Sequence, residues 1–277
     1  MSISLIASAL IAAQPLTTAQ PATIDHSFNQ REIELAEDRG RRIYAYDRVA
    51  LAGLERALND IDDGTAVVGY VVTETDQGPV LTLIADAEGG IAAAWRGLFI
   101  DGKMKRLPFG SHNRPALSDQ EKWLFKRKRA ALDYIFDADH GVDLYSCAGD
   151  TRPNVVVLRP TESDPHTLVY ILTPQPGGRL FEPGGNFRVE FDAKLNPERL
   201  RPLSGELGIP KSPTRCLQQT FNMDGRESIP IVRHENGAIP TEIHVYTSLL
   251  ADGQMTVATK AGPWWEVNRG KIAPRPR

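Results

Sequence analysis

The chain contains little cysteine, has no excess of positive charge and lacks a long apolar run after its N-terminus. Cys147 and Cys216 are the only cysteines among 277 residues. Lys and Arg total 32 against 35 Asp and Glu, which gives a net charge of −3. That balance argues against a dedicated nucleic-acid-binding protein, because such proteins are normally basic. No later apolar stretch approaches the roughly 20 residues that a membrane-spanning helix needs, so none is expected.

The motifs of the commonest enzymes are also missing. The stretch Phe136 to Asp150, "FDADHGVDLYSCAGD", is rich in aspartate, but Gly141 and Ala148 stand where a calcium loop needs its third ligand and its glutamate. "RHENG" begins like the zinc helix motif H-E-x-x-H, yet Ala238 replaces the second histidine. There is no phosphate-binding loop. We therefore predict neither a metal nor a cofactor.

A nucleophilic hydrolase remains an alternative reading of that stretch. Ser146 and Cys147 are adjacent and are the weak catalytic candidates. Neither lies in G-x-S-x-G, the motif that exposes a serine on a strained turn. Either nucleophile would also need a histidine partner, which the sequence does not single out. We instead expect this polar stretch to end a helix and form a turn.

The N-terminus has the features of an export signal. Ile3 to Ala13, "ISLIASALIAA", is apolar, and small residues follow around Thr17 and Ala19. This pattern predicts a signal peptide over residues 1–19, although no positive charge precedes the apolar core. The alternative is an N-terminal helix docked on a cytoplasmic fold. An exported chain with two cysteines is expected to form one disulfide, Cys147–Cys216, the alternative being two buried thiols.

Two helical segments are expected in residues 31–140, after a mobile lead-in over 20–30. Residues 31–60 are predicted to be helical in two pieces, because Gly40 is expected to break or bend the helix. The second segment follows Pro115, where Ser118 and Glu121 have the spacing of a capping box. Lys128 is expected on the apolar side of this helix, with its ammonium group extending to solvent.

The remaining elements read as antiparallel strands. Runs over 65–74 and 78–85 are separated by a turn, and a hairpin is expected around Asp101–Gly102. Residues 141–277 are predicted to be β-rich, and they form either a second region or one continuous domain with the preceding part. Within them, 241–259 is expected to form a hairpin that turns at Asp252–Gly253. The sequence therefore predicts an α+β fold, with antiparallel sheets and two main helical segments packed against them.

One polar sheet face is the candidate ligand-binding surface. Arg188 and Glu190 alternate with apolar residues in "NFRVEFDA", and His244 and Tyr246 do so in "TEIHVYTS". If these strands are neighbours, the four side chains form one hydrogen-bonding surface. The alternative is an ordinary solvated sheet face. The binding hypothesis predicts that Arg188→Ala with His244→Ala abolishes binding and leaves the melting temperature nearly unchanged.

Residues 145–268 resemble a known group of proteins. "NVVVLRP", "LVYILTPQ", "GGNFRVEFD", "RCLQQ", "EIHVYTSL" and "WWEV" resemble the recurring blocks of a family of uncharacterised exported bacterial proteins. The resemblance implies export and structural roles for Cys147 and Cys216, and it attaches no activity to any residue. Asn186 stands where such proteins often have a histidine.

The sequence as a whole predicts an exported protein, periplasmic or secreted, that is not an enzyme. Its expected role is to bind a ligand or a protein partner on a sheet face, with no nucleic acid involved. The alternatives are a hydrolase using Cys147 or Ser146, and a cytoplasmic regulatory or immunity-type protein.

Overall fold

A computed structural model describes most of the chain after residue 25. Only the backbone is described at 26–29, 180–181 and 219–220. The predicted signal peptide, Ser146, Cys147 and Cys216 lie outside the described residues, so these predictions stay open. The described ranges are 26–61, 64–108, 114–137, 153–174, 180–181, 185–203, 219–220, 229–234, 237–260 and 263–275.

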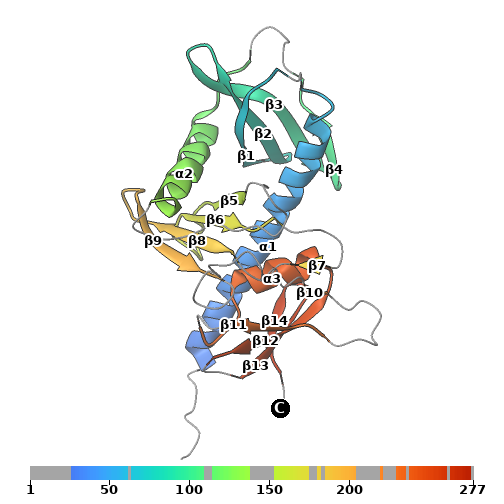
Figure 1. The fold of residues 1–277 in the computed structure, drawn as a ribbon, viewed down its shortest axis with the longest axis vertical. Coiled ribbons are helices and arrows are strands. Elements are labelled where there is room, and N and C mark those ends of the chain that lie inside the picture. Colours follow the sequence, from blue (N-terminus) through green and yellow to red (C-terminus); the bar gives the residue numbers. More distant parts are fainter. Residues whose placement is uncertain are drawn as a thin grey trace, which may run out of the picture.

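The described residues form an α+β fold, as predicted (Figure 1). The helices are α1 (His26–Ala57), α2 (Asp119–Ile135) and α3 (Glu242–Leu250). The N-terminal sheet has the order β1 (Val67–Thr75), β2 (Gly78–Ala87), β3 (Gly90–Ile100), β4 (Lys103–Arg106). The central sheet has the order β5 (Asn154–Leu158), β6 (Leu168–Leu172), β8 (Phe187–Phe191), β9 (Pro197–Pro202). The C-terminal sheet has the order β11 (Ile231–His234), β12 (Gln254–Thr259), β13 (Trp264–Asn268), β14 (Lys271–Pro274), and β7 (Leu180–Phe181) pairs with β10 (Gln219–Thr220).

Turn chemistry places the hairpins of the N-terminal sheet where the sequence predicts them. Asp101 and Gly102 have φ values of 50° and 74° between β3 and β4. Two consecutive positive φ values are typical of a tight hairpin turn whose twist matches its strands. The sheet is an antiparallel meander throughout. In the C-terminal sheet, by contrast, β11 pairs with β12 in parallel.

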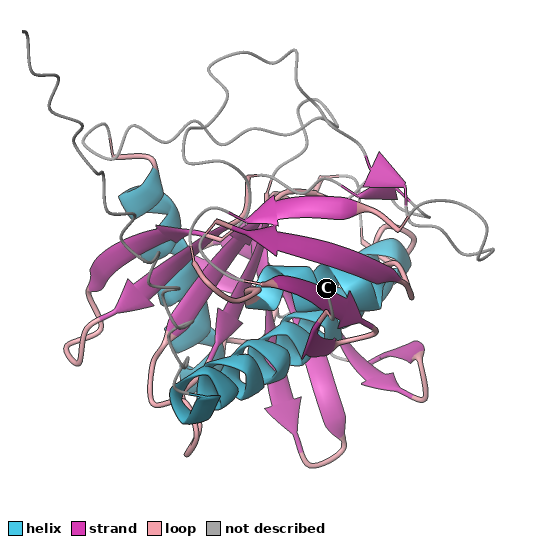
Figure 2. Ribbon diagram, turned by 90° about the horizontal axis from the view of Figure 1, so that it is seen from below, coloured by secondary structure: helices cyan, strands magenta, loops and turns pink. Residues whose placement is uncertain are grey.

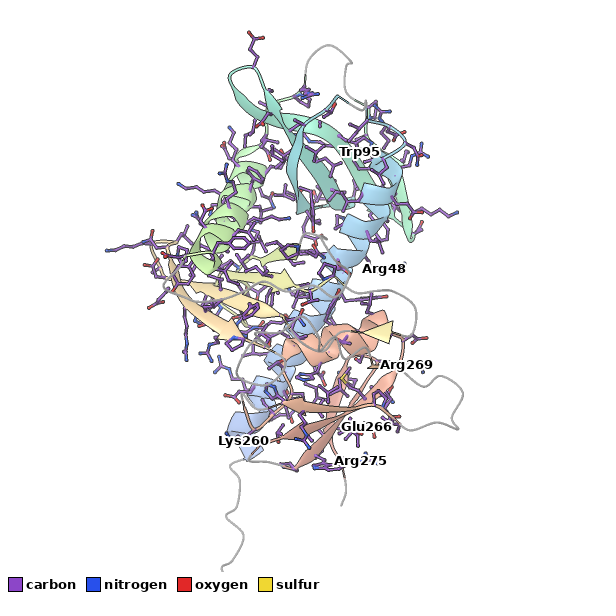
Figure 3. The ribbon with its side chains drawn as sticks, in the orientation of Figure 1. Arg48, Trp95, Lys260, Glu266, Arg269 and Arg275 are labelled. Atoms are coloured by element: carbon purple, nitrogen blue, oxygen red, sulfur yellow. The ribbon has the colours of Figure 1, made fainter. Side chains whose placement is uncertain are left out.

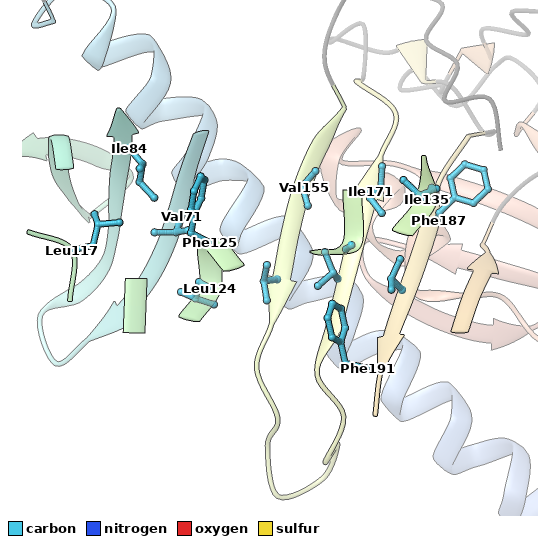
Figure 4. Packing of buried hydrophobic residues seen from close by; sticks show 14 of the residues in the cluster. Val71, Ile84, Leu117, Leu124, Phe125, Ile135, Val155, Ile171, Phe187 and Phe191 are labelled. Carbon is cyan, nitrogen blue, oxygen red and sulfur yellow. The ribbon is translucent and has the colours of Figure 1, made fainter. Parts of the chain in front are cut away.

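The capped helix α2 holds the N-terminal and central sheets together. The Ser118 side chain accepts a hydrogen bond from the Glu121 amide, and Glu121 accepts one from the Ser118 amide. The predicted capping box is thus confirmed. Figure 4 shows the apolar core that this helix shares with the two sheets, which includes Leu124, Phe125, Val71, Val155 and Phe187.

Helix α1 is continuous through Gly40, so the predicted break is wrong. Gly40 serves a different purpose, because a Cβ atom there would lie 2.4 Å from Val245 Cγ1 and 2.8 Å from the Glu242 carbonyl oxygen. The missing side chain lets α1 and α3 cross at close range. Helix α1 also begins at His26, within the range expected as a lead-in.

The predicted hairpin over 241–259 is wrong in its first half, because residues 242–250 form α3. Thr241 caps this helix, because its amide donates a hydrogen bond to His244 Nδ1 at 3.0 Å and its carbonyl oxygen accepts one from the His244 amide at 3.1 Å. Seven of its nine residues are buried. Because the helix is buried on nearly every side, its sequence does not show the apolar and polar faces from which a period of 3.6 residues is recognised. Asp252, with φ 46°, turns the chain from α3 into β12.

Helix α1 forms the spine of the molecule. It contacts strands of the N-terminal sheet, β5 of the central sheet and β14 of the C-terminal sheet, and α3 packs across it (Figures 1 and 2). The three sheets therefore share one helical support.

Candidate functional site

Arg188 and Glu190 belong to a buried ion-pair network on the second face of the central sheet. Arg188 is 8% exposed, and it donates hydrogen bonds to Glu242 of α3 and to Glu190, the latter at 2.6 Å from Nη2. The Tyr170 hydroxyl donates to the same Glu242 oxygen at 2.8 Å. Burial opposes ionisation of Glu242, but the Arg188 and Arg39 guanidinium groups outweigh it and lower the pKa of this carboxyl.

The prediction that these side chains form an exposed binding surface is therefore wrong. The central sheet is covered by α2 on one face, and on the other it packs against α1 and α3. Removing Arg188 would leave the buried Glu242 carboxylate without its main cation, which is typically strongly destabilising. The expectation that Arg188→Ala with His244→Ala spares the melting temperature fails for the same reason.

His244 is buried beside a second histidine. The His244 ring is 3% exposed and lies edge-on to His234, with ring centroids 5.1 Å apart. Its Nδ1 accepts a hydrogen bond from the Thr241 amide at 3.0 Å. Burial, reinforced by His234, lowers the pKa of His244 to about 3, so the ring is neutral at physiological pH. Among the described residues, no group of three or more His, Cys, Asp and Glu side chains could hold a metal ion.

Tyr246 ties α3 to α1 rather than facing a ligand. Its hydroxyl donates to Asp47 Oδ2 at 3.0 Å. Asn154 donates to the other oxygen of Asp47 and accepts a hydrogen bond from the Tyr70 hydroxyl. Burial raises the pKa of Tyr246 well above its usual value, with the Asp47 charge adding to the effect. This chain of polar groups joins two helices to both neighbouring sheets.

Lys128 lies at a small cavity between β1 and β5. Contrary to the expectation that it reaches solvent, it is 8% exposed, and its ammonium group lies 3.4 Å from the centroid of the Tyr70 ring. It donates to the Tyr70 carbonyl oxygen at 3.2 Å, and burial lowers its pKa to about 7. A partly neutral amine is a potential nucleophile. The cavity measures about 20 Å³, however, which holds about one water molecule and leaves no room for a substrate.

The outer face of the C-terminal sheet carries both exposed cations and exposed large apolar side chains. Its inner face packs against α1 and α3, so alternate residues along each strand point the other way. We define the outer face by residues Ile231, Arg233, Thr256, Ala258, Lys260, Trp264, Glu266, Ala273 and Arg275. Strand register aligns Arg233, Ala258 and Trp264 in one row, and the Arg275 amide bonds to the Trp264 carbonyl to extend that row.

The outer face carries three cations and one carboxylate. Arg233, Lys260 and Arg275 are exposed, and Trp264 is 50% exposed between the two arginine positions of its row. The Arg275 guanidinium donates to Thr256 Oγ1 at 2.8 Å, which places this side chain across β13. Within the described part of the chain, neither Arg233 nor Lys260 forms an ion pair with an acidic side chain. The positive charge of this face is therefore available to a partner.

The sequence does not single out the outer face as a candidate binding surface. The sequence predicts His244 and Tyr246 on a sheet face, whereas α3 places both in the interior. Arg233 lies on β11, whereas Lys260 and Arg275 directly follow the last residues of β12 and β14. Only the parallel pairing of β11 with β12 brings Arg233 into the row, and no local pattern signals that pairing.

In the part of the chain that the structure describes, no helix is long and apolar enough to cross a bilayer. Comparison of the chain with protein families, curated proteins and solved structures finds no match.

Proposed function

We propose that this is an exported protein that acts by binding, not by catalysis, and that the outer face of its C-terminal sheet is the binding surface. One observation carries the proposal, namely the exposed row Arg233–Ala258–Trp264–Arg275, with Lys260 beside it. Arginine and tryptophan are enriched among residues that dominate binding interfaces. Export to the periplasm or cell surface, with one disulfide, rests on the sequence of residues 1–19 and on the two cysteines.

The electrostatics of the face point to an anionic partner. Exposed cations that outnumber the carboxylates beside them steer oppositely charged partners and fix their orientation. The chain as a whole is slightly acidic, at −3. Because the net charge of the protein is negative, binding to an anion would have to come from the local positive charge of the outer face.

Retention on a sulfonate cation-exchange resin at neutral pH and low salt tests this proposal. The wild-type chain is expected to be retained despite its net charge, because the outer face presents its cations together. Arg233→Glu with Lys260→Glu is expected to abolish retention without lowering the melting temperature, since neither side chain has an ion-pair partner among the described residues.

The matched control reverses two cations at the far end of the molecule. Lys103→Glu with Lys105→Glu on β4 changes the net charge by the same amount, at two exposed positions. This variant is expected to elute close to the wild type. Equal loss of retention in both variants, or no retention of the wild type, would contradict an anion-binding outer face.

A further inference from the structure

We infer that the partner of the outer face is the surface of an anionic phospholipid bilayer. This inference rests on the binding role proposed for the same face and names the chemistry of the partner.

The residue types on the outer face match those of a membrane-contacting surface. Trp264 and Ile231 are 50% and 49% exposed, so two large apolar side chains project from a surface that also carries the cations. Tryptophan is enriched at the depth of lipid headgroups because its ring is amphipathic. Lys and Arg beside such residues are attracted to anionic headgroups. Arg233 and Lys260 supply that charge next to the two apolar side chains.

The position of the face in the molecule also fits a bilayer. Figure 3 shows Lys260, Glu266 and Arg275 at the end of the molecule farthest from the N-terminal sheet. A surface at one end meets a planar membrane without collision from the rest of the protein. Because the face is a sheet surface, its side chains project from adjacent strands about 5 Å apart. Several of them can therefore reach one plane together.

The position at which α1 begins gives an independent reason to propose a bilayer as the partner. Helix α1 begins at the same end of the molecule as the C-terminal sheet (Figure 1). Twelve residues, 14–25, separate the apolar segment Ile3–Ala13 from His26, and a fully extended chain of that length spans at most about 40 Å. Until the expected cleavage near Ala19 removes it, insertion of the apolar segment in a membrane would hold the outer face within reach of the same membrane.

A bilayer explains the composition of the face better than single-stranded nucleic acid does. Nucleic-acid platforms stack successive bases on several aromatic side chains. The outer face has one tryptophan and an aliphatic residue, Ile231, which offers no stacking partner to a base. Lipid headgroups and the adjacent acyl boundary accommodate both.

Vesicle sedimentation tests the inference directly. The full chain is incubated with vesicles of phosphatidylglycerol and phosphatidylcholine in equal parts, and with vesicles of phosphatidylcholine alone. Binding is expected only to the first, and it is expected to weaken as salt is added, because ionic screening shortens the reach of exposed charges. Arg233→Glu with Lys260→Glu is expected to lower the partition coefficient by about 600-fold, since each cation near an anionic surface contributes roughly fivefold and reversal counts twice. The control Lys103→Glu with Lys105→Glu is expected to bind like the wild type.

Tryptophan fluorescence reports whether Trp264 itself enters the interface. With brominated phospholipid in the vesicles, the emission of the wild type is expected to be quenched on binding. Trp264→Phe is expected to bind but to lose most of this quenching, because Trp95 and Trp265 are buried and the partly buried Trp123 lies on α2, away from the outer face. Equal quenching in both proteins would overturn the assignment.

The outcomes separate this inference from the proposed function. Retention on the sulfonate resin without binding to phosphatidylglycerol vesicles would overturn the lipid partner and leave the anion-binding role standing. Loss of both would overturn both. Vesicle binding that survives Arg233→Glu with Lys260→Glu would show that another segment contacts the lipid, which also overturns the inference. Tighter binding to a single-stranded oligonucleotide than to the vesicles would overturn it in favour of nucleic acid.

Discussion

Among the residues that the structure describes, no carboxylate contacts the buried amine of Lys128. Its amine bonds to the Tyr70 carbonyl and lies over the Tyr70 ring, and both contacts are weak compensation for lost hydration. The sequence places Lys128 correctly on the apolar side of α2. It does not show that β1 and β5 close over the end of the side chain, because that requires the packing of two sheets. Lys128 therefore makes stability depend on pH.

The residue-scale prediction concerns Lys128→Met. The pKa of Lys128 falls from 10.5 to about 7 on folding, so above pH 7 the unfolded chain holds a proton that the folded chain has lost. The free energy of unfolding of the wild type is then expected to rise with pH, by about 2 kcal/mol between pH 7 and pH 9. The Met variant lacks this rise and is more stable at pH 7 by about 2 kcal/mol.

Urea denaturation across this pH range measures the effect. Lys126→Met is the control, because Lys126 is exposed on the same helix. Equal pH dependence in the wild type and in both variants would contradict a neutral buried amine.

At the scale of elements, the sequence predicts strands and turns well where local chemistry decides them. The Asp101–Gly102 hairpin and the capped helix α2 are confirmed because each depends on a few adjacent residues. Helix α3 could not be predicted in this way. Ile243 and Val245 alternate with polar residues, which is a pattern typical of a strand. The segment is instead a helix that packs closely against α1 at Gly40.

Gly40→Ala tests that crossing. Alanine is intrinsically better than glycine in a helix by about 1 kcal/mol. The new Cβ atom would nevertheless overlap Val245 and the backbone of α3, so the variant is expected to lose about 2–3 kcal/mol of stability, as overpacked cores do. Thermal denaturation monitored by circular dichroism measures the change.

Gly64→Ala provides the matched comparison, because a Cβ atom at Gly64 would meet nothing within 4 Å. Its melting temperature is expected to stay within a few degrees of the wild type. If Gly40→Ala were the more stable of the two, the close approach of α1 and α3 would be disproved.

At the scale of the whole molecule, the compartment of the protein determines whether its two cysteines form a disulfide or remain thiols. Intact mass spectrometry of the protein expressed from Met1 in a Gram-negative host is expected to show cleavage near Ala19. Cys147 and Cys216 are expected to react with an alkylating reagent only after reduction, since disulfides persist in oxidising compartments. A full-length mass with two reactive thiols would instead support the cytoplasmic alternative and return Cys147 to the list of nucleophile candidates.

Because α1 lies near the start of the chain and α3 near its end, the contact between them can form only late in synthesis. Gly40 is synthesised about 200 residues before Glu242, its contact in α3. At the usual rates of synthesis this interval is on the order of 10 to 40 seconds. Throughout it, the first helix lacks the partner that buries its central turn. If the chain is exported as proposed, this delay leaves α1 without its α3 contact while the chain passes through the translocation channel.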